Sequence, residues 1–165
     1  MANDTLIYWD SNVFIDLIEK TPARYQVLEG IVNSAERGEV RIVTSAMSLV
    51  EVSKLNNLGG VLPEWKEKLI VQFFENDYIS VRTVDRVVAE TARPIIRGHN
   101  LKAPDAIHVA TALLARAQVL HTYDSQDLLP LDRKIGLPSL PLLRIEEPKW
   151  EFQPPLAGLT SVTAP

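Results

Sequence analysis

Short apolar runs alternate with longer segments of helical periodicity along most of the chain. Runs of four or five bulky apolar residues are typical of buried strands, whereas apolar residues that recur every three or four positions are typical of helices. On these patterns we expect strands at residues 6–9, 40–44, 78–82, 119–122 and 140–145. We expect a first helix that opens at residues 10–12 and ends at Pro22, and further helices at residues 25–37, 45–57, 64–76, 84–98 and 103–118.

Strands that alternate with helices in this way predict a three-layer α/β/α domain with a mostly parallel central sheet. We assign residues 1–147 to this domain. Residues 148–165 contain four prolines and few charges, which predicts an extended tail that docks through Trp150 and Phe152. Pro94 should kink or restart the helix at residues 84–98, because proline lacks the amide hydrogen that an inner helical position donates.

The segment Leu101–Asp124 organises the rest of the chain. Ala103-Pro104-Asp105 is typical of a helix start, because proline is tolerated in the first turn and aspartate interacts with the free amides there. The helix that follows is apolar almost all round, which indicates burial. A short strand comes next, and Asp124 lies just beyond its carboxyl end. In open α/β sheets, ligands bind at that edge.

Composition narrows the possible classes of protein. A length of 165 residues with 46% hydrophobic residues suits one domain with a packed core. The chain has no apolar run long enough to span a membrane, no visible secretory signal and no cysteine, so we expect a cytoplasmic protein without disulfides or thiolate metal sites. With a net charge of −4, any contact with nucleic acid must use a local basic patch.

Four carboxylates share one topological property. Asp10 and Asp124 directly follow apolar strands, Asp105 opens a buried helix, and Glu51 lies early in the helix after the second strand. A parallel sheet would place all four at the edge where strands end and helices begin. Singly, the two aspartates at helix starts could be N-caps, Asp124 a turn residue and Glu51 helix surface. Capping explains four acids at one edge less well than a shared site does.

Acids gathered in one crevice repel one another, and a hard divalent cation would relieve that repulsion. Mg²⁺ and Mn²⁺ prefer oxygen ligands, and the chain has neither cysteine nor a histidine pair at zinc spacing. A site of this kind can activate water for an in-line displacement at phosphorus. The acids therefore predict a site for Mg²⁺ or Mn²⁺.

Four sequence motifs, in order, resemble the PIN-domain ribonucleases, and among them the toxins of VapBC-type toxin–antitoxin pairs. The motifs are DSNVFIDL near the N-terminus, SAMSLVEV in the middle, then LKAPDAIHVATA and TYD. The resemblance covers residues 6–129 and implies a Mg²⁺- or Mn²⁺-dependent endoribonuclease that leaves a 5′-phosphate, a homodimer and an antitoxin partner.

The resemblance also assigns residues. It implies an acidic quartet of Asp10, Glu51, Asp105 and Asp124, with the metal held mainly by the three aspartates and Glu51 binding its waters or a second ion. The accessory polar residues that it matches are Ser11, Asn12 and Thr122. A further acid, Asp127, lies near Asp124 and could also bind the metal.

Two further groups have open interpretations. We interpret His108, one turn after Asp105, as a hydrogen-bonded core histidine rather than a catalytic base. Arg86, Arg93 and Arg97 are spaced seven and four residues apart, so they share one helix face. That face is either an ordinary solvated surface or a track for RNA phosphates that leads to the acidic site.

Two other functions compete with the nuclease. A non-catalytic PIN-like scaffold would bind RNA or a protein, although a degenerate site usually loses one of its acids. A phosphatase or phosphoacceptor domain would have a second acid two residues after its nucleophilic aspartate, and position 12 here is Asn.

Overall fold

The computed structural model of the chain describes residues 5–53 and 61–150. Its centre is a five-stranded sheet in the order β3-β2-β1-β4-β5, in which all four pairs of neighbouring strands are parallel. The strands are β1 (Thr5–Trp9), β2 (Val40–Ser45), β3 (Ile79–Arg82), β4 (Val119–His121) and β5 (Arg144–Glu146). The mostly parallel sheet predicted from the alternating pattern is confirmed.

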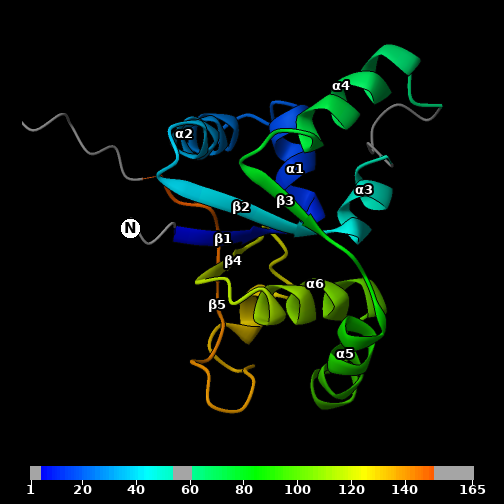
Figure 1. Cartoon of the computed structure of the whole chain (residues 1–165), viewed down its shortest axis with the longest axis vertical. Coiled ribbons are helices and arrows are strands. Elements are labelled where there is room, and N and C mark those ends of the chain that lie inside the picture. Colours follow the sequence, from blue (N-terminus) through cyan, green and yellow to red (C-terminus); the bar gives the residue numbers. More distant parts are fainter. Residues whose placement is uncertain (1–4, 54–60, 151–165) are drawn as a thin grey trace, which may run out of the picture.

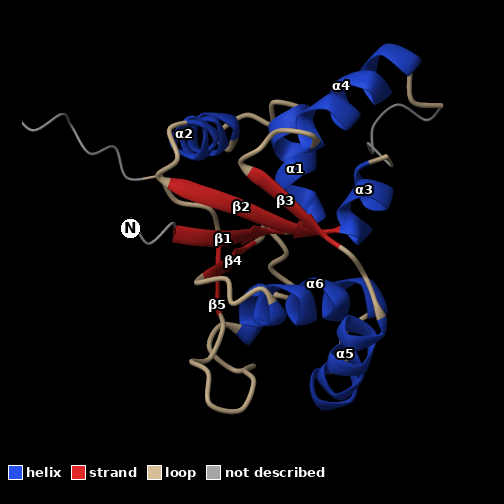
Figure 2. Ribbon diagram, viewed as in Figure 1, coloured by secondary structure: helices blue, strands red, loops and turns tan. Residues whose placement is uncertain are grey.

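Helices cover both faces of the sheet and make three layers (Figures 1 and 2). On one face lie α1 (Ser11–Ile18), α2 (Tyr25–Glu36) and α4 (Glu64–Phe74), and on the other lie α5 (Arg86–His99) and α6 (Ala103–Leu114). The short helix α3 (Ala46–Val52) continues directly from β2, and one 3₁₀ turn spans Leu129–Leu131. None of these helices is long and apolar enough to cross a membrane in the part of the chain described.

The two cores follow from the alternation of side chains along a strand. In β1, Ile7 and Trp9 belong to the core under α1, α2 and α4, whereas Tyr8 belongs to the core under α5 and α6. Ile42 and Val43 of β2 divide between the cores in the same way. Because side chains on successive residues point to opposite faces, an apolar run without polar gaps indicates a strand that is covered on both sides.

Three differences from the prediction have a clear structural cause, two of them at element boundaries. Helix α6 ends at Leu114, not near residue 118, because Arg116 adopts a left-handed conformation with φ 56°. The amides of Arg116 and Ala117 then donate to the carbonyls of Leu113 and Ala112, which closes the helix in a Schellman motif. Strand β5 begins at Arg144 rather than at residue 140, because Leu143 is engaged by its own loop, where its amide donates to the Ile135 carbonyl.

The third difference concerns Pro94. Helix α5 runs through it from Arg86 to His99 without a restart. Pro94 is exposed, and the buried face of the helix is formed by Val88, Ala92 and Ile95 in the core shared with α6. Packing of that face compensates for the missing amide hydrogen bond.

Two predicted segments fall partly outside the described residues. The helix after β2 is described to Val52, and residues 54–57 of its predicted span lie outside. Of the tail, residues 148–150 are described, and there the Trp150 ring packs so closely over Gly30 of α2 that a Cβ at Gly30 would clash with it. Trp150 is thus docked as predicted, whereas Phe152 lies outside the described residues and the domain boundary at residue 147 stays a prediction.

Candidate metal-dependent nuclease site

The four carboxylates predicted to share an edge come from elements that the sheet brings together. Because β1, β2 and β4 are parallel neighbours, their carboxyl ends point the same way. Asp10 follows β1 directly, Glu51 lies on α3 at the end of β2, and Asp124 lies three residues beyond β4. Asp105 is in the first turn of α6. It is not the N-cap of that helix, since the cap position is held by Lys102.

Asp10 is both a helix cap and an inner acid of the site. Its side chain is the N-cap of α1, accepting a hydrogen bond from the Val13 amide at 3.3 Å. The Thr122 hydroxyl and the Asn12 amide also donate to it, at 2.5 and 2.9 Å. Only 3% of the residue is exposed, and this burial raises its carboxyl pKa from 3.8 to about 6. The capping interpretation is therefore correct for Asp10, and it does not exclude a site role.

Asn12 and Thr122 join the turn after β1 to the turn after β4. The Asn12 side-chain amide donates to the Thr122 hydroxyl at 3.2 Å, and its carbonyl oxygen accepts from the Tyr123 amide at 3.0 Å. The Asp124 amide donates to the Thr122 hydroxyl at 3.0 Å. Thr122 thus connects Asp10 with the backbone of Asp124. Ser11, the other accessory candidate, is the partly buried first residue of α1.

A cluster of three acids lies at the surface of this edge. One carboxylate oxygen from each of Asp105, Asp124 and Asp127 lies within 4.8 Å of the others. Partial burial and the charges of Asp124 and Asp127 raise the pKa of Asp105. The cluster includes two of the three predicted metal ligands and the further acid Asp127, whereas Asp10 lies outside it.

These three side chains suit a hard divalent cation. All three are partly buried and offer only oxygen. Asp124 is oriented by its own turn, since its Oδ1 accepts from the amides of Gln126 and Asp127 at 2.9 Å each. Lys102 donates to Asp127 at 2.8 Å and balances part of the negative charge, and this ion pair raises the pKa of Lys102. The sequence contained no pattern that would pair Lys102 with Asp127, 25 residues away.

Glu51 is tied to the core by His108. The Nε2 atom of His108 lies 2.8 Å from Oε2 of Glu51, and its Nδ1 atom lies 2.8 Å from the hydroxyl of Tyr8. The prediction of a hydrogen-bonded core histidine is confirmed. We did not predict that its partner would be an acid of the quartet, or that Tyr8 would take part. One signal existed for Tyr8, because it lies two residues before Asp10 and so on the same side of β1.

The three arginines of α5 are exposed on the side of the helix away from its core, as predicted. Arg86 donates to Glu90 of the next turn at 2.7 Å. Within the described chain, Arg93 and Arg97 have no ion-pair partner, so they are the better candidates for contacts with phosphate.

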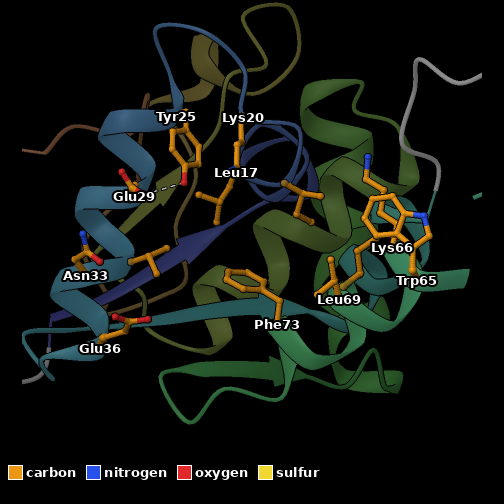
Figure 3. A pocket seen from close by; sticks show the side chains of 13 residues that line it. Leu17, Lys20, Tyr25, Glu29, Asn33, Glu36, Trp65, Lys66, Leu69 and Phe73 are labelled. Atoms are coloured by element: carbon orange, nitrogen blue, oxygen red, sulfur yellow. Dashed lines mark hydrogen bonds between the residues drawn. The ribbon is translucent and has the colours of Figure 1, made fainter. Parts of the chain in front are cut away.

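An apolar groove lies between α2 and α4, on the face of the sheet opposite to α5 and α6 (Figure 3). Its volume is about 730 Å³. Trp65 and Leu69 of α4 line it and remain 65% and 56% exposed, while Glu29 and Glu36 of α2 lie opposite them. Large apolar side chains left exposed beside a groove are a common feature of surfaces that bind other proteins.

Fold and acidic edge together define a class, the α/β/α domains with carboxylates at the carboxyl ends of a parallel sheet. The chain belongs to the PIN domain family, whose model matches residues 7–133. The comparison with curated proteins gives no match.

Solved structures of similar fold include three from toxin–antitoxin systems. A toxin–antitoxin complex from Klebsiella pneumoniae aligns at 21% identity and a TM-score of 0.54, covering 73% of this chain and 88% of the other. VapC20 of Mycobacterium tuberculosis, a toxin that cleaves the sarcin–ricin loop, aligns at 18% identity and a TM-score of 0.59. The alignment covers 73% of this chain and 91% of VapC20. VapBC2 of Rickettsia felis, bound to a DNA fragment from its promoter, aligns at 14% identity and a TM-score of 0.60. The alignment covers 88% of this chain and 99% of the other.

Proposed function

We propose that this protein is a Mg²⁺- or Mn²⁺-dependent endoribonuclease, and the toxin of a toxin–antitoxin pair. The observation that carries the proposal is the cluster of Asp105, Asp124 and Asp127 at the carboxyl edge of the sheet, with Asp10 held behind it by Thr122. Membership of the PIN family and the fold shared with VapC proteins support the same function.

In this proposal the aspartates hold the metal ion. Asp105 and Asp124 are the central ligands, Asp10 completes the predicted set, and Asp127 is a further ligand from the surface. A divalent cation bound there would polarise the scissile phosphate and make a water molecule more acidic. Glu51 accepts hydrogen bonds from water at the same edge. The arginines of α5 and Lys102 attract the RNA backbone, which compensates for the net negative charge of the protein.

The rest of the proposal concerns partners. The antitoxin occupies the apolar groove between α2 and α4, where Trp65 and Leu69 are exposed. The toxin is a homodimer and acts in the cytoplasm, where its RNA substrate is found. A scaffold without catalysis would share the fold, but it would have no need for three acids arranged around one point.

The test is cleavage of total bacterial RNA by protein purified free of any partner. We expect fragments with Mg²⁺ or Mn²⁺ and none in EDTA, and sequencing of the ends should show 5′-phosphates at defined sites. Asp105→Asn should reduce the rate by about 100-fold or more, because it removes a metal ligand. The control is Asp77→Asn, which changes an exposed aspartate at the opposite edge of the sheet, just before β3.

Cleavage by Asp105→Asn at the wild-type rate would remove this residue from the site. A protein that binds RNA but never cleaves it, with metal present, would support the scaffold function instead.

A further inference from the structure

His108 has an unusual position for a polar side chain. It lies in the middle of α6, a helix whose other buried residues are mostly apolar, and only 2% of it is exposed. Both of its ring nitrogens are engaged, one with Tyr8 of β1 and the other with Glu51 of α3. The Tyr8 ring packs edge-on against the imidazole with the ring centroids 5.9 Å apart. His108 therefore links a central strand to an acid of the site through the interior of the domain.

The side chains of Tyr8, His108 and Glu51 determine which group donates each hydrogen bond and which accepts it. An ionised carboxylate only accepts, so the Nε2–H of His108 must donate to Oε2 of Glu51. In the neutral imidazole, Nδ1 is then the acceptor and takes its hydrogen bond from the Tyr8 hydroxyl. Complete burial of Tyr8 raises its pKa above the ordinary value, which keeps its hydroxyl protonated and able to donate.

His108 gives Glu51 a fixed partner, as backbone amides do for two of the aspartates. Asp10 caps α1 and Asp124 caps its own turn, so both are oriented by nearby backbone amides. Glu51 has a longer side chain and lies near the end of a helix of only seven residues. It is close enough to Asp10 for its charge to raise the pKa of that carboxyl. A rotamer held by His108 keeps its carboxylate near Asp10.

We propose that His108 is a positioning residue of the nuclease site, which acts through Glu51 and is itself oriented by Tyr8. The proposal rests on the proposed function, because Glu51 needs a fixed place only if metal and water bind at this edge. Hydrogen bonds behind the residues of a metal site commonly change metal affinity or activity by about 10–100-fold.

Two substitutions at position 108 separate the hydrogen bond from the packing. His108→Leu fills much of the space without a donor, whereas His108→Gln can place an amide near the position of Nε2. We expect His108→Leu to lower kcat for cleavage of total RNA by about 10–100-fold and to weaken Mn²⁺ binding by about 10-fold, measured by calorimetry on the intact protein. His108→Gln should recover most of both losses, and Tyr8→Phe should give an intermediate loss.

Thr111→Val is the matched control on the same helix. It removes a buried hydroxyl one turn further on, which donates to the Ile107 carbonyl of its own helix. It should lower the melting temperature without changing kcat or Mn²⁺ affinity. The decisive comparison is Glu51→Gln with and without His108→Leu. If His108 acts through Glu51, the second change should leave kcat and Mn²⁺ affinity within about two-fold of the single variant.

The outcomes distinguish the two proposals. If wild type neither cleaves RNA nor binds Mn²⁺, the proposed function is wrong and the role of His108 falls with it. If wild type is active but His108→Leu matches it in kcat and Mn²⁺ affinity, only the positioning role is wrong. An equal loss in the wild-type and Glu51→Gln backgrounds would also overturn it, because His108 would then act independently of Glu51.

Discussion

Asp10 shows how one side chain can stabilise local structure and still weaken the fold. As the N-cap of α1 it satisfies a backbone amide, but its charge is buried, and burial raises its pKa to about 6. Between pH 4 and 6 the native protein therefore holds more protons at this carboxyl than the unfolded chain does. Stability falls as pH rises through that range, by about 3 kcal/mol for a pKa difference of about two units.

Asp10→Asn should for this reason stabilise the metal-free protein at neutral pH. Asparagine caps helices as well as aspartate does, so the bond from the Val13 amide is kept. Its amide group would replace the oxygen that accepts from Asn12 and Thr122, and the expected gain is what remains of the relieved buried charge after that loss. We expect the free energy of unfolding at pH 7.5 in EDTA to rise by about 1–3 kcal/mol, and the gain to disappear near pH 4. Urea unfolding at the two pH values measures it.

The matched control is Asp85→Asn, which changes the exposed N-cap of α5 and should have little effect at either pH. Each variant must be compared with wild type at the same pH, because His121 changes the stability of the protein with pH in the opposite direction to Asp10. Burial lowers the pKa of His121 to about 4, so the unfolded chain binds the extra proton and stability is lost as pH falls below about 6.5. A less stable Asp10→Asn at pH 7.5 would contradict the prediction.

At the scale of elements, α5 has two faces with different roles. Its apolar residues pack into the core with α6, and this packing carries the helix through Pro94. Its outer face holds Arg93 and Arg97, one turn apart, and the paired Arg86. The helix ends at His99, and its C-cap Asn100 adopts the left-handed conformation. Helix α6 begins three residues after Asn100, with Asp105 in its first turn.

Replacing Arg93 and Arg97 with Gln should weaken RNA binding and its dependence on salt. Each contact with a phosphate of single-stranded RNA releases counterions and adds about 0.7 to the slope of log K against log salt. Loss of two contacts should lower the slope by about 1.4, measured by fluorescence anisotropy with a labelled single-stranded RNA. Arg86→Gln should change the slope less, because Arg86 is already paired with Glu90. An unchanged slope in the double variant would make this face ordinary surface.

At the scale of the whole molecule, the sheet separates two surfaces. The acids lie at its carboxyl edge. The groove between α2 and α4 lies over one face (Figure 3). A partner that fills only the groove would therefore lie away from the acids of the proposed metal site. Its affinity should depend on the apolar residues of α4 and not on the metal ligands.

Leu69→Lys should weaken binding of the proposed antitoxin by at least about 10-fold, because a central apolar contact of the groove is lost. The partner to test is the product of the adjacent small reading frame, co-purified and then titrated against each variant. Val71→Lys is the matched control, since Val71 is also exposed on α4 but does not line the groove. RNA cleavage by both variants should equal that of wild type. Equal binding by the two variants would place the partner elsewhere.

The secondary structure, the two cores and the positions of two acids could be predicted from local sequence patterns. Apolar runs indicate strands, and the alternation of side chains along a strand divides its residues between the two cores. Because Asp10 and Asp124 follow apolar runs, they are expected at the carboxyl ends of strands. Such features depend on residues close together in the chain, so periodicity and chain direction are enough to predict them.

Distances across the fold required the tertiary structure. The sequence alone predicted that Asp10, Glu51, Asp105 and Asp124 lie at one edge. Packing decided that Asp127 joins Asp105 and Asp124, and that Asp10 lies deeper, behind Thr122. The link from Glu51 to His108 spans 57 residues, and it depends on how α3 and α6 meet over the sheet. The continuity of α5 through Pro94 likewise depends on its packing against α6. Local preferences determined which residues could form the site, and the packing of distant elements decided which of them touch.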